Sequence, residues 1–165
     1  GQRNTTQYVR PAGATAQRPP QHWQAQSDSA IGDGIRLLGY DVQPVPLRAG
    51  EILYLQLHWL VDQTPVGDWV VFTHLLRSDG GGGYVQVAGQ DGRPGGGSLP
   101  TGRWQAGWRI LDEYQIALPG DLPPGVYTLA AGLYQPGGAG AQARLPAPGP
   151  QATAEGVLLG EVIIE

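Results

Sequence analysis

The chain has 165 residues, with ten basic and fourteen acidic side chains and a formal net charge of −4. This length fits one domain with a core large enough to need no disulfide or metal. All ten basic residues are Arg and they form no basic stripe, so the sequence disfavours nucleic-acid binding. Cys is absent, which excludes disulfides and thiolate chemistry.

The absence of Met and of a long apolar run bears on the cellular location that we expect for the chain. The sequence contains no Met, so we expect a processed or trimmed product, and removal of a signal segment before Gly1 is one explanation. No apolar run is long enough to cross a membrane, and no membrane segment is therefore predicted in this chain.

Residues 1–30 differ from the rest of the chain. They are rich in Gln, Ala, Thr, Arg and Pro and show neither a helical nor a sustained strand period. This composition predicts an extended N-terminal arm. Before Pro11 one segment could pair as a short strand: Thr5, Thr6, Gln7, Tyr8 and Val9. We expect this segment to dock on a protein neighbour by β-augmentation.

Residues 31–165 are predicted to form one all-β domain. Short runs of β-branched and aromatic residues recur there between Gly and Pro clusters. These runs predict seven strands: Ile35–Asp41, Ile52–Val61, Trp69–Arg77, Tyr84–Ala88, Arg109–Leu118, Val126–Tyr134 and Val157–Ile164. With seven to eight strands, the domain should be an antiparallel β-sandwich of immunoglobulin-like or jelly-roll type.

Side-chain alternation predicts which faces are buried. Along 52–61 the apolar residues occupy every second position, with Tyr54, Gln56 and His58 on the opposite face. The run Val70–Leu76 is almost entirely apolar and predicts a central strand. Tyr127 follows a Pro-Pro-Gly turn and is placed to tie a corner of the sandwich.

A succession of motifs between residues 35 and 165 is familiar: IRLLGYDV, RAGEILYLQLHW, WVVFTHLLRSDG, GQDGRPGGGSLPTGRW, LPPGVYTLAAGLYQP and LLGEVIIE. Together they resemble a β-sandwich domain at the extracytoplasmic end of multi-spanning, glycosyltransferase-like membrane proteins of Chloroflexota. The resemblance covers about four-fifths of the chain. It implies an exported domain and brings no defined activity. The present chain departs from that setting because it has no membrane segment and its arm has no recognised counterpart.

The sequence assigns no catalytic residue. Ser98 lies in Gly-Gly-Ser-Leu-Pro, which is not a nucleophile elbow. The three His residues are far apart in the sequence; His74 is expected to be a hydrogen-bonded core residue and His58 to face solvent. Asp112 falls on the apolar side of its strand, so a structural hydrogen-bond role is expected, with Arg103, Arg109 or His74 as partner.

No cofactor is predicted, although structural calcium stays open as an alternative. Calcium binds several loop oxygens, and acidic residues recur in or beside Gly-rich loops. These residues are Asp28, Asp33, Asp62, Asp68, Asp79 and Asp91. Their spacing fits no EF-hand, and Asp-Gly pairs are ordinary turn formers.

The long connection Gly89–Trp108 holds a candidate ligand site. Gln90, Asp91, Arg103 and Trp104 could bind a sugar, with the indole ring against the apolar face of a pyranose. The alternative is that Trp104 closes one end of the sandwich. A solvent-facing Trp104 would favour sugar binding, whereas a buried one would favour the structural alternative.

These observations lead to two functional hypotheses. The first is a non-enzymatic, extracytoplasmic structural module, secreted or at the cell surface, whose arm docks on another copy of the chain or on a surface assembly. The second is an accessory module that binds glycans. Neither hypothesis involves nucleic acid.

Overall fold

The computed structural model describes residues 8–9, 22–23, 30–32, 34–44, 46–136, 152–153 and 156–165. No helix in this part of the chain has the length and apolar character needed to cross a membrane.

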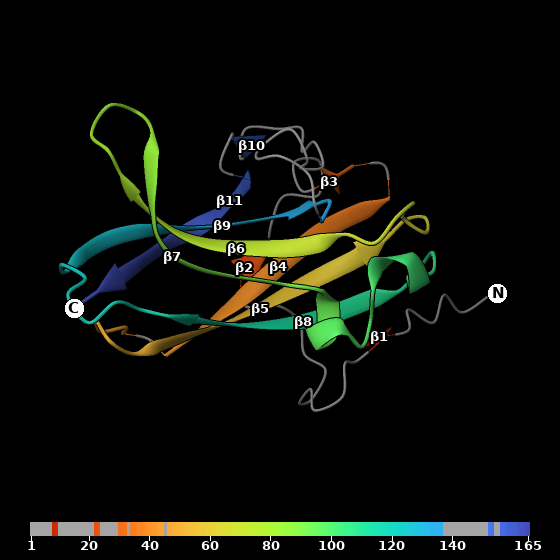
Figure 1. Ribbon diagram of the computed structural model, residues 1–165, viewed down its shortest axis with the longest axis horizontal. Coiled ribbons are helices and arrows are strands. Elements are labelled where there is room, and N and C mark those ends of the chain that lie inside the picture. Colours follow the sequence, from red (N-terminus) through yellow and green to blue (C-terminus); the bar gives the residue numbers. More distant parts are fainter. Residues whose placement is uncertain are drawn as a thin grey trace.

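The domain is an all-β sandwich, as the sequence predicts. Sheet A has the spatial order β1 (Tyr8–Val9), β8 (Arg109–Ala117), β5 (Ile52–Val61), β4 (Ile35–Gln43) and β2 (His22–Trp23), and β3 (Ala30–Ile31) also pairs with β4. Sheet B has the order β10 (Ala152–Thr153), β11 (Gly156–Ile164), β9 (Gly125–Tyr134), β6 (Val70–Ser78) and β7 (Tyr84–Gly92). Figure 1 shows the two sheets as stacked layers.

The long strands match the predicted ones closely. All seven have nine or ten residues, and the pairs among them are antiparallel. The largest difference is β7, which runs four residues beyond its predicted end and reaches Gly92. Propensity places the end of a strand at the first glycines, but Gly89 and Gly92 lie opposite residues of β6 and continue its ladder.

The core lies between the sheets and follows the predicted alternation. Leu53, Leu55, Leu57 and Trp59 of β5 have no exposed surface. From sheet B, alternate residues of β9 and β11 point into the same cluster. The predicted central strand is confirmed, because residues 70–76 of β6 are all buried and β6 lies between β7 and β9.

The predicted corner at Tyr127 is also confirmed. Its hydroxyl donates a hydrogen bond of 2.6 Å to the Pro123 carbonyl, which ties the start of β9 to the preceding turn. Tyr127 itself is buried. The corner therefore fixes the path of the chain as it enters sheet B.

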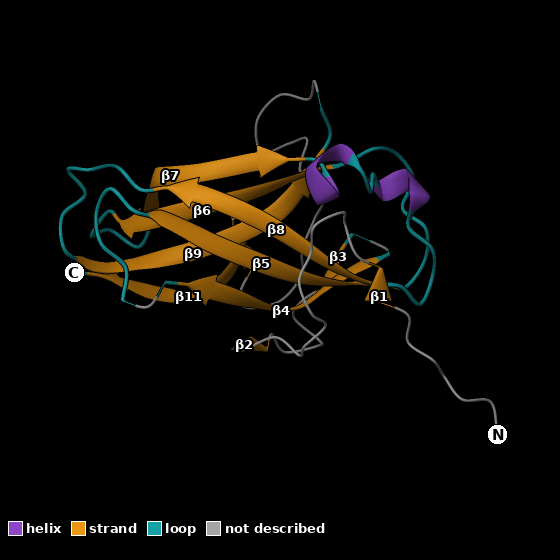
Figure 2. Cartoon of the chain, turned by 90° about the horizontal axis from the view of Figure 1, so that it is seen from below, coloured by secondary structure: helices purple, strands orange, loops and turns teal. Residues whose placement is uncertain are grey.

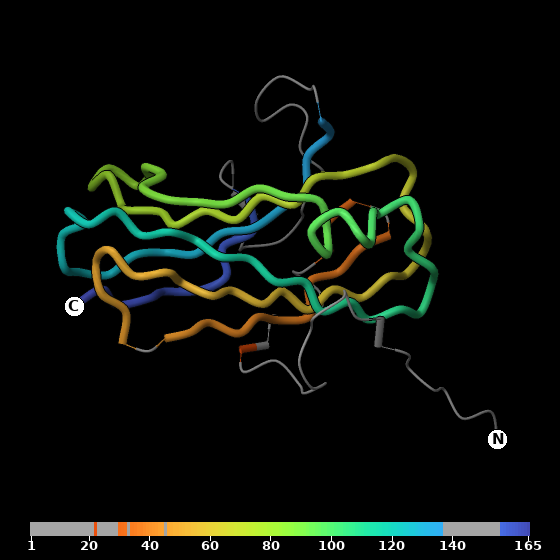
Figure 3. The backbone as a smooth tube through the Cα atoms, turned by 60° about the horizontal axis from the view of Figure 1, so that its bottom comes forward, coloured from red at the N-terminus to blue at the C-terminus, as the bar shows by residue number. Residues whose placement is uncertain are grey.

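Two short 3-10 turns, Pro94–Gly97 and Thr101–Arg103, follow β7. They lie at the end of the sandwich opposite the C-terminus (Figures 2 and 3). Gly95, Gly96 and Gly97 have φ values of 66°, 66° and 92°, a region that favours glycine. The run of glycines in the sequence thus follows from the backbone conformation of this turn.

Candidate functional site

Trp104 is part of the core, which favours the structural alternative over an exposed sugar platform at this residue. Its side chain has no exposed surface, and its ring centroid lies 6.3 Å from that of Trp59. The indole Nε1 donates a hydrogen bond of 2.9 Å to the Leu99 carbonyl. Trp104 thus closes the sandwich end, because its large apolar ring gains more from burial than from exposure.

The other three residues of that predicted set do not converge on one ligand. Gln90 Oε1 accepts a hydrogen bond of 2.6 Å from the Gln115 backbone N–H, and Asp91 Oδ2 accepts one of 3.0 Å from the Tyr134 hydroxyl. Gln90 and Asp91 are neighbours on β7, so their side chains point to opposite sides. Arg103 is exposed at the end of the second 3-10 turn.

The arm residues assigned to a partner fall into two groups. Thr5, Thr6 and Gln7 lie outside the described residues. Tyr8 and Val9 form β1, which pairs in parallel with Arg109 and Ile110 of the same chain.

Asp112 is fully buried and accepts three hydrogen bonds. Oδ1 accepts one from the Gly95 N–H at 3.0 Å, and Oδ2 accepts one from the Tyr114 hydroxyl at 2.6 Å and one from Trp59 Nε1 at 3.3 Å. The expected structural role is therefore correct, whereas the expected partners Arg103, Arg109 and His74 are not the ones bonded to it here. Sequence reasoning missed the actual donors, because Gly95 and Trp59 lie far from Asp112 in the sequence and only the folded chain brings them to its carboxylate.

The surroundings of Asp112 change its acidity. Burial raises the pKa of its carboxyl from the ordinary 3.8 to about 6, and the hydrogen bonds from Gly95, Tyr114 and Trp59 oppose that rise. Burial and the neighbouring carboxylate also raise the pKa of Tyr114. All three bonded groups are parts of the fold, so Asp112 joins the Gly95 turn to β8.

His58 does not face solvent as expected. It is 2% exposed, and its Nε2 lies 2.7 Å from Oδ2 of the equally buried Asp41. The expectation failed because alternation alone places His58 on the outer face of sheet A and cannot show what covers that face. His74 is buried, as expected, with its ring centroid 4.8 Å from that of Phe72.

The acidic loop residues that the structure describes do not gather into one cluster. Asp62 pairs with Arg36 at 2.7 Å, and Asp68 pairs with Arg93 at 2.8 Å. Asp79 accepts hydrogen bonds from the backbone of its own Gly-rich turn, and these bonds lower its pKa. Among the described residues no group of three or more His, Asp or Glu could hold a metal ion. Asp28 and Asp33 lie outside those residues.

Among the described residues, an exposed tyrosine lies on the outer face of sheet A, at the end nearer the C-terminus. Tyr54 is 48% exposed there, and Ile52 beside it on β5 is 40% exposed. Both point away from the core because Leu53 and Leu55 point into it. Six large apolar side chains are exposed in the described part of the chain; Tyr54 is the aromatic one among them, while Val66, Val126 and Ile163 are more exposed.

The strand register places one glutamine on each side of Tyr54. Gln43 of β4 lies opposite Tyr54 on one side, and Gln115 of β8 lies opposite it on the other. Directly opposed side chains have Cβ atoms about 5 Å apart, so the three residues form one row across three strands. Both glutamines are exposed, and within the described residues no hydrogen bond engages their side-chain amides.

A second row runs beside the first. Gln56 of β5 lies opposite Glu113 of β8, and its Nε2 donates a hydrogen bond of 2.9 Å to Glu113 Oε1. We call the combined patch the Tyr54 surface, and it consists of Gln43, Ile52, Tyr54, Gln56, Glu113 and Gln115.

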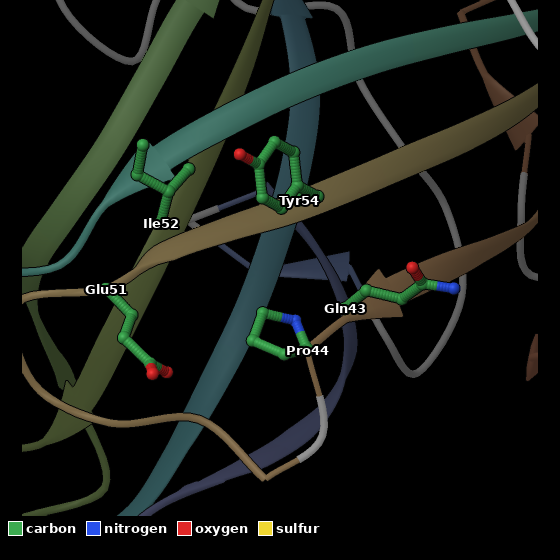
Figure 4. A pocket seen from close by; sticks show the side chains of 5 residues that line it. All are labelled: Gln43, Pro44, Glu51, Ile52 and Tyr54. Carbon is green, nitrogen blue, oxygen red and sulfur yellow. The ribbon is translucent and has the colours of Figure 1, made fainter.

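A shallow depression of about 430 Å³ borders this surface. It is lined by Gln43, Pro44, Glu51, Ile52 and Tyr54. Figure 4 shows Ile52 and Tyr54 side by side on β5, with Gln43 and Pro44 from the end of β4 beside them. The volume is of ligand size, but the depression is open, so a ligand would lie on the sheet rather than be enclosed.

Sequence reasoning placed Tyr54 and Gln56 on the outer face but assigned them no role. The available signal was a tyrosine and a glutamine in the polar half of an alternating strand. The site can be recognised only when the strand register is known, because the register brings Gln43 and Gln115 to either side of Tyr54. Register is not readable from one sequence.

Comparisons with known proteins show no family for this chain. No protein-family model matches it, and no curated protein sequence matches it. One similar solved structure is the C-terminal domain of wzt, which is 15% identical and aligns with a TM-score of 0.48 over 82% of this chain and 76% of that chain.

Proposed function

We propose that this domain is a non-enzymatic carbohydrate-binding module that works outside the cytoplasm and binds its ligand on the Tyr54 surface. The observation that carries the proposal is the exposed ring of Tyr54, flanked in register by Gln43 and Gln115. A sugar ring has apolar C–H faces and a rim of hydroxyls. A phenol ring can cover such a face, while amides both donate to and accept from the hydroxyls.

The shape of the surface supports binding without catalysis. Catalytic groups act in preorganised sites from which water is largely excluded. The Tyr54 surface is open, and the depression beside it is shallow. Asp112, whose pKa is raised to about 6, accepts hydrogen bonds from three groups of the fold instead of facing this surface.

The proposed location outside the cytoplasm has a separate basis. It rests on the resemblance of the strand and turn motifs to exported sandwich domains. The arm-mediated assembly suggested by the sequence stays a prediction. Because Tyr8 and Val9 already have a strand partner in their own chain, we assign the function to the Tyr54 surface and not to the arm.

A glycan array followed by titration calorimetry with the best ligand tests the proposal. Tyr54→Ala should abolish binding, and Tyr54→Phe should retain most of it because the ring remains. Tyr84→Ala, which removes a tyrosine from β7 of the other sheet, is the matched control and should bind normally. The proposal fails if the domain binds no glycan, or if Tyr54→Ala binds as tightly as the unmodified protein.

A further inference from the structure

The row formed by Gln43, Tyr54 and Gln115 has a direction. It runs across β4, β5 and β8, perpendicular to the strands. Neighbouring strands are about 4.8 Å apart, so the outer two glutamines are separated by roughly 10 Å. This row is longer than a single sugar ring can cover, and its ring-contacting residue lies in the middle.

Within the described residues, no strand pairs with the sheet beside either end of the row, although at one end the Gln90 side chain of β7 accepts a hydrogen bond of 2.6 Å from the Gln115 backbone N–H. On one side, β2 and β3 pair with β4 only between Ile35 and Tyr40, well before Gln43. On the other side, β1 pairs with β8 at Arg109 and Ile110, far from Gln115. A linear ligand lying on the outer face could therefore continue past Gln43 at one end, and at the other end it would pass over Gln90 of β7.

The charge around the row is negative. The segments 42–43, 52–56 and 113–117 contain no Arg, Lys or His, and Glu113 is exposed among them, whereas the neighbouring Asp41 is buried against His58. Glu51 adds a carboxylate on the side of the depression. An acidic polysaccharide would bring like charges together here, and no basic side chain of these segments would offset the repulsion.

We infer that the ligand of the Tyr54 surface is an internal segment of a linear, uncharged polysaccharide that lies across β4, β5 and β8. This inference rests on the proposed function and adds the charge, the direction and the binding mode of the ligand. A central sugar stacks on Tyr54, and the sugars before and after it contact Gln43 and Gln115. Chain ends are not recognised, because among the described residues no paired strand closes the row at either end.

The role of each glutamine follows from this arrangement. A net hydrogen bond contributes about 0.5–1.5 kcal/mol, which is roughly a two- to tenfold change in affinity. Gln43 and Gln115 thus set the affinity for chains of three sugars or more and leave the weak affinity for a single sugar unchanged. Tyr54 contributes both to the affinity for these longer chains and to the affinity for a single sugar.

Calorimetry or NMR titration with neutral gluco-, xylo- and manno-oligosaccharides of one to six units tests the inference. Affinity should rise with length up to about three units and then level off. Blocking the reducing end of a hexasaccharide should leave its affinity unchanged. Oligogalacturonate of equal length should bind at least tenfold more weakly at low salt.

Variants separate the inference from the proposed function. Gln43→Ala and Gln115→Ala should each weaken hexasaccharide binding roughly two- to tenfold. Gln86→Ala on β7 is the matched control and should have no effect. Absence of binding to every oligosaccharide would overturn the proposed function. Binding that depends on Tyr54 but requires a free chain end, prefers oligogalacturonate or ignores both glutamines would overturn only the further inference.

Discussion

Gln56 and Glu113 lie opposite each other on β5 and β8, and the Gln56 side chain donates a hydrogen bond of 2.9 Å to the Glu113 carboxylate. The bond holds a negative charge beside Tyr54, one register pair away from the ring. An exposed hydrogen bond of this kind adds little to stability. The effect of the hydrogen bond is to hold the Glu113 carboxylate in place on the Tyr54 surface.

The first prediction concerns this charge. Glu113→Gln should raise the affinity for oligogalacturonate roughly two- to fivefold at low salt, because one repulsive charge is removed. Affinity for the neutral oligosaccharide should change less. Calorimetry at two salt concentrations measures both ratios, and the difference between the variant and the unmodified protein should shrink at high salt. If the variant and the unmodified protein showed the same ratio of affinities for the neutral oligosaccharide and oligogalacturonate at low salt, Glu113 would have no role in selectivity.

A second prediction concerns Trp104. Trp104→Ala should lower the free energy of unfolding by about 3–5 kcal/mol, since it empties a fully buried aromatic site. Trp104→Phe fills more of that space and should leave a folded domain. Urea denaturation measures the stability, and calorimetry with a neutral hexasaccharide should give unchanged binding for Trp104→Phe. Loss of binding in this folded variant would contradict a ligand site at Tyr54 and would place it in the Gln90–Trp104 region instead.

A third prediction follows from the raised pKa of Asp112. Between the ordinary value of 3.8 and the folded value of about 6, the folded state holds a proton that the unfolded state has released. This contribution to stability is therefore full below pH 3.8 and is lost as the pH rises through 6. The shift corresponds to about 3 kcal/mol as an order of magnitude.

Asp112→Asn removes that titration and provides the control. Asn cannot accept from all three donors, so the variant should lose a constant amount of stability at every pH. The stability advantage of the unmodified protein over the variant should therefore be largest near pH 4 and should fall toward pH 8. Urea denaturation across this range measures it. A difference that stays constant or grows with pH would contradict the assigned ionisation.

Much of the fold was predictable because strand existence depends on local signals. The alternation of Leu53, Leu55, Leu57 and Trp59 locates one strand and its buried face, and the apolar run of β6 locates another. These patterns report burial directly. The extent of β7 was less predictable, since glycines that usually end a strand are here opposite residues of β6.

The site was less predictable for a different reason. Exposure separates Trp104 from Tyr54, and exposure depends on what packs against each ring. Trp104 comes from a long connection, where sequence allows either a surface or a buried position, and the ring of Trp59 decides the outcome. The row beside Tyr54 depends on the register of β4, β5 and β8, which long-range pairing sets.

A fourth prediction tests the backbone of the turn that reaches Asp112. Gly96 has a φ of 66° and open space around its Cα, so Gly96→Ala should cost about 1–2 kcal/mol through backbone conformation alone. Gly81→Ala is the matched control, because Gly81 is exposed in a turn without a positive φ. Urea denaturation should show a small change for the control. Equal effects of the two substitutions would contradict the left-handed conformation at Gly96.

The central claim is that the Tyr54 surface binds a neutral glycan, and amide chemical-shift mapping tests it most directly. Uniformly ¹⁵N-labelled protein is titrated with a neutral hexasaccharide that the domain binds. We expect the largest shifts at Gln43, Tyr54, Gln56, Glu113 and Gln115, and none of that size in sheet B. Shifts centred on β7 and the 3-10 turns, or no shifts at saturating concentrations, would contradict it.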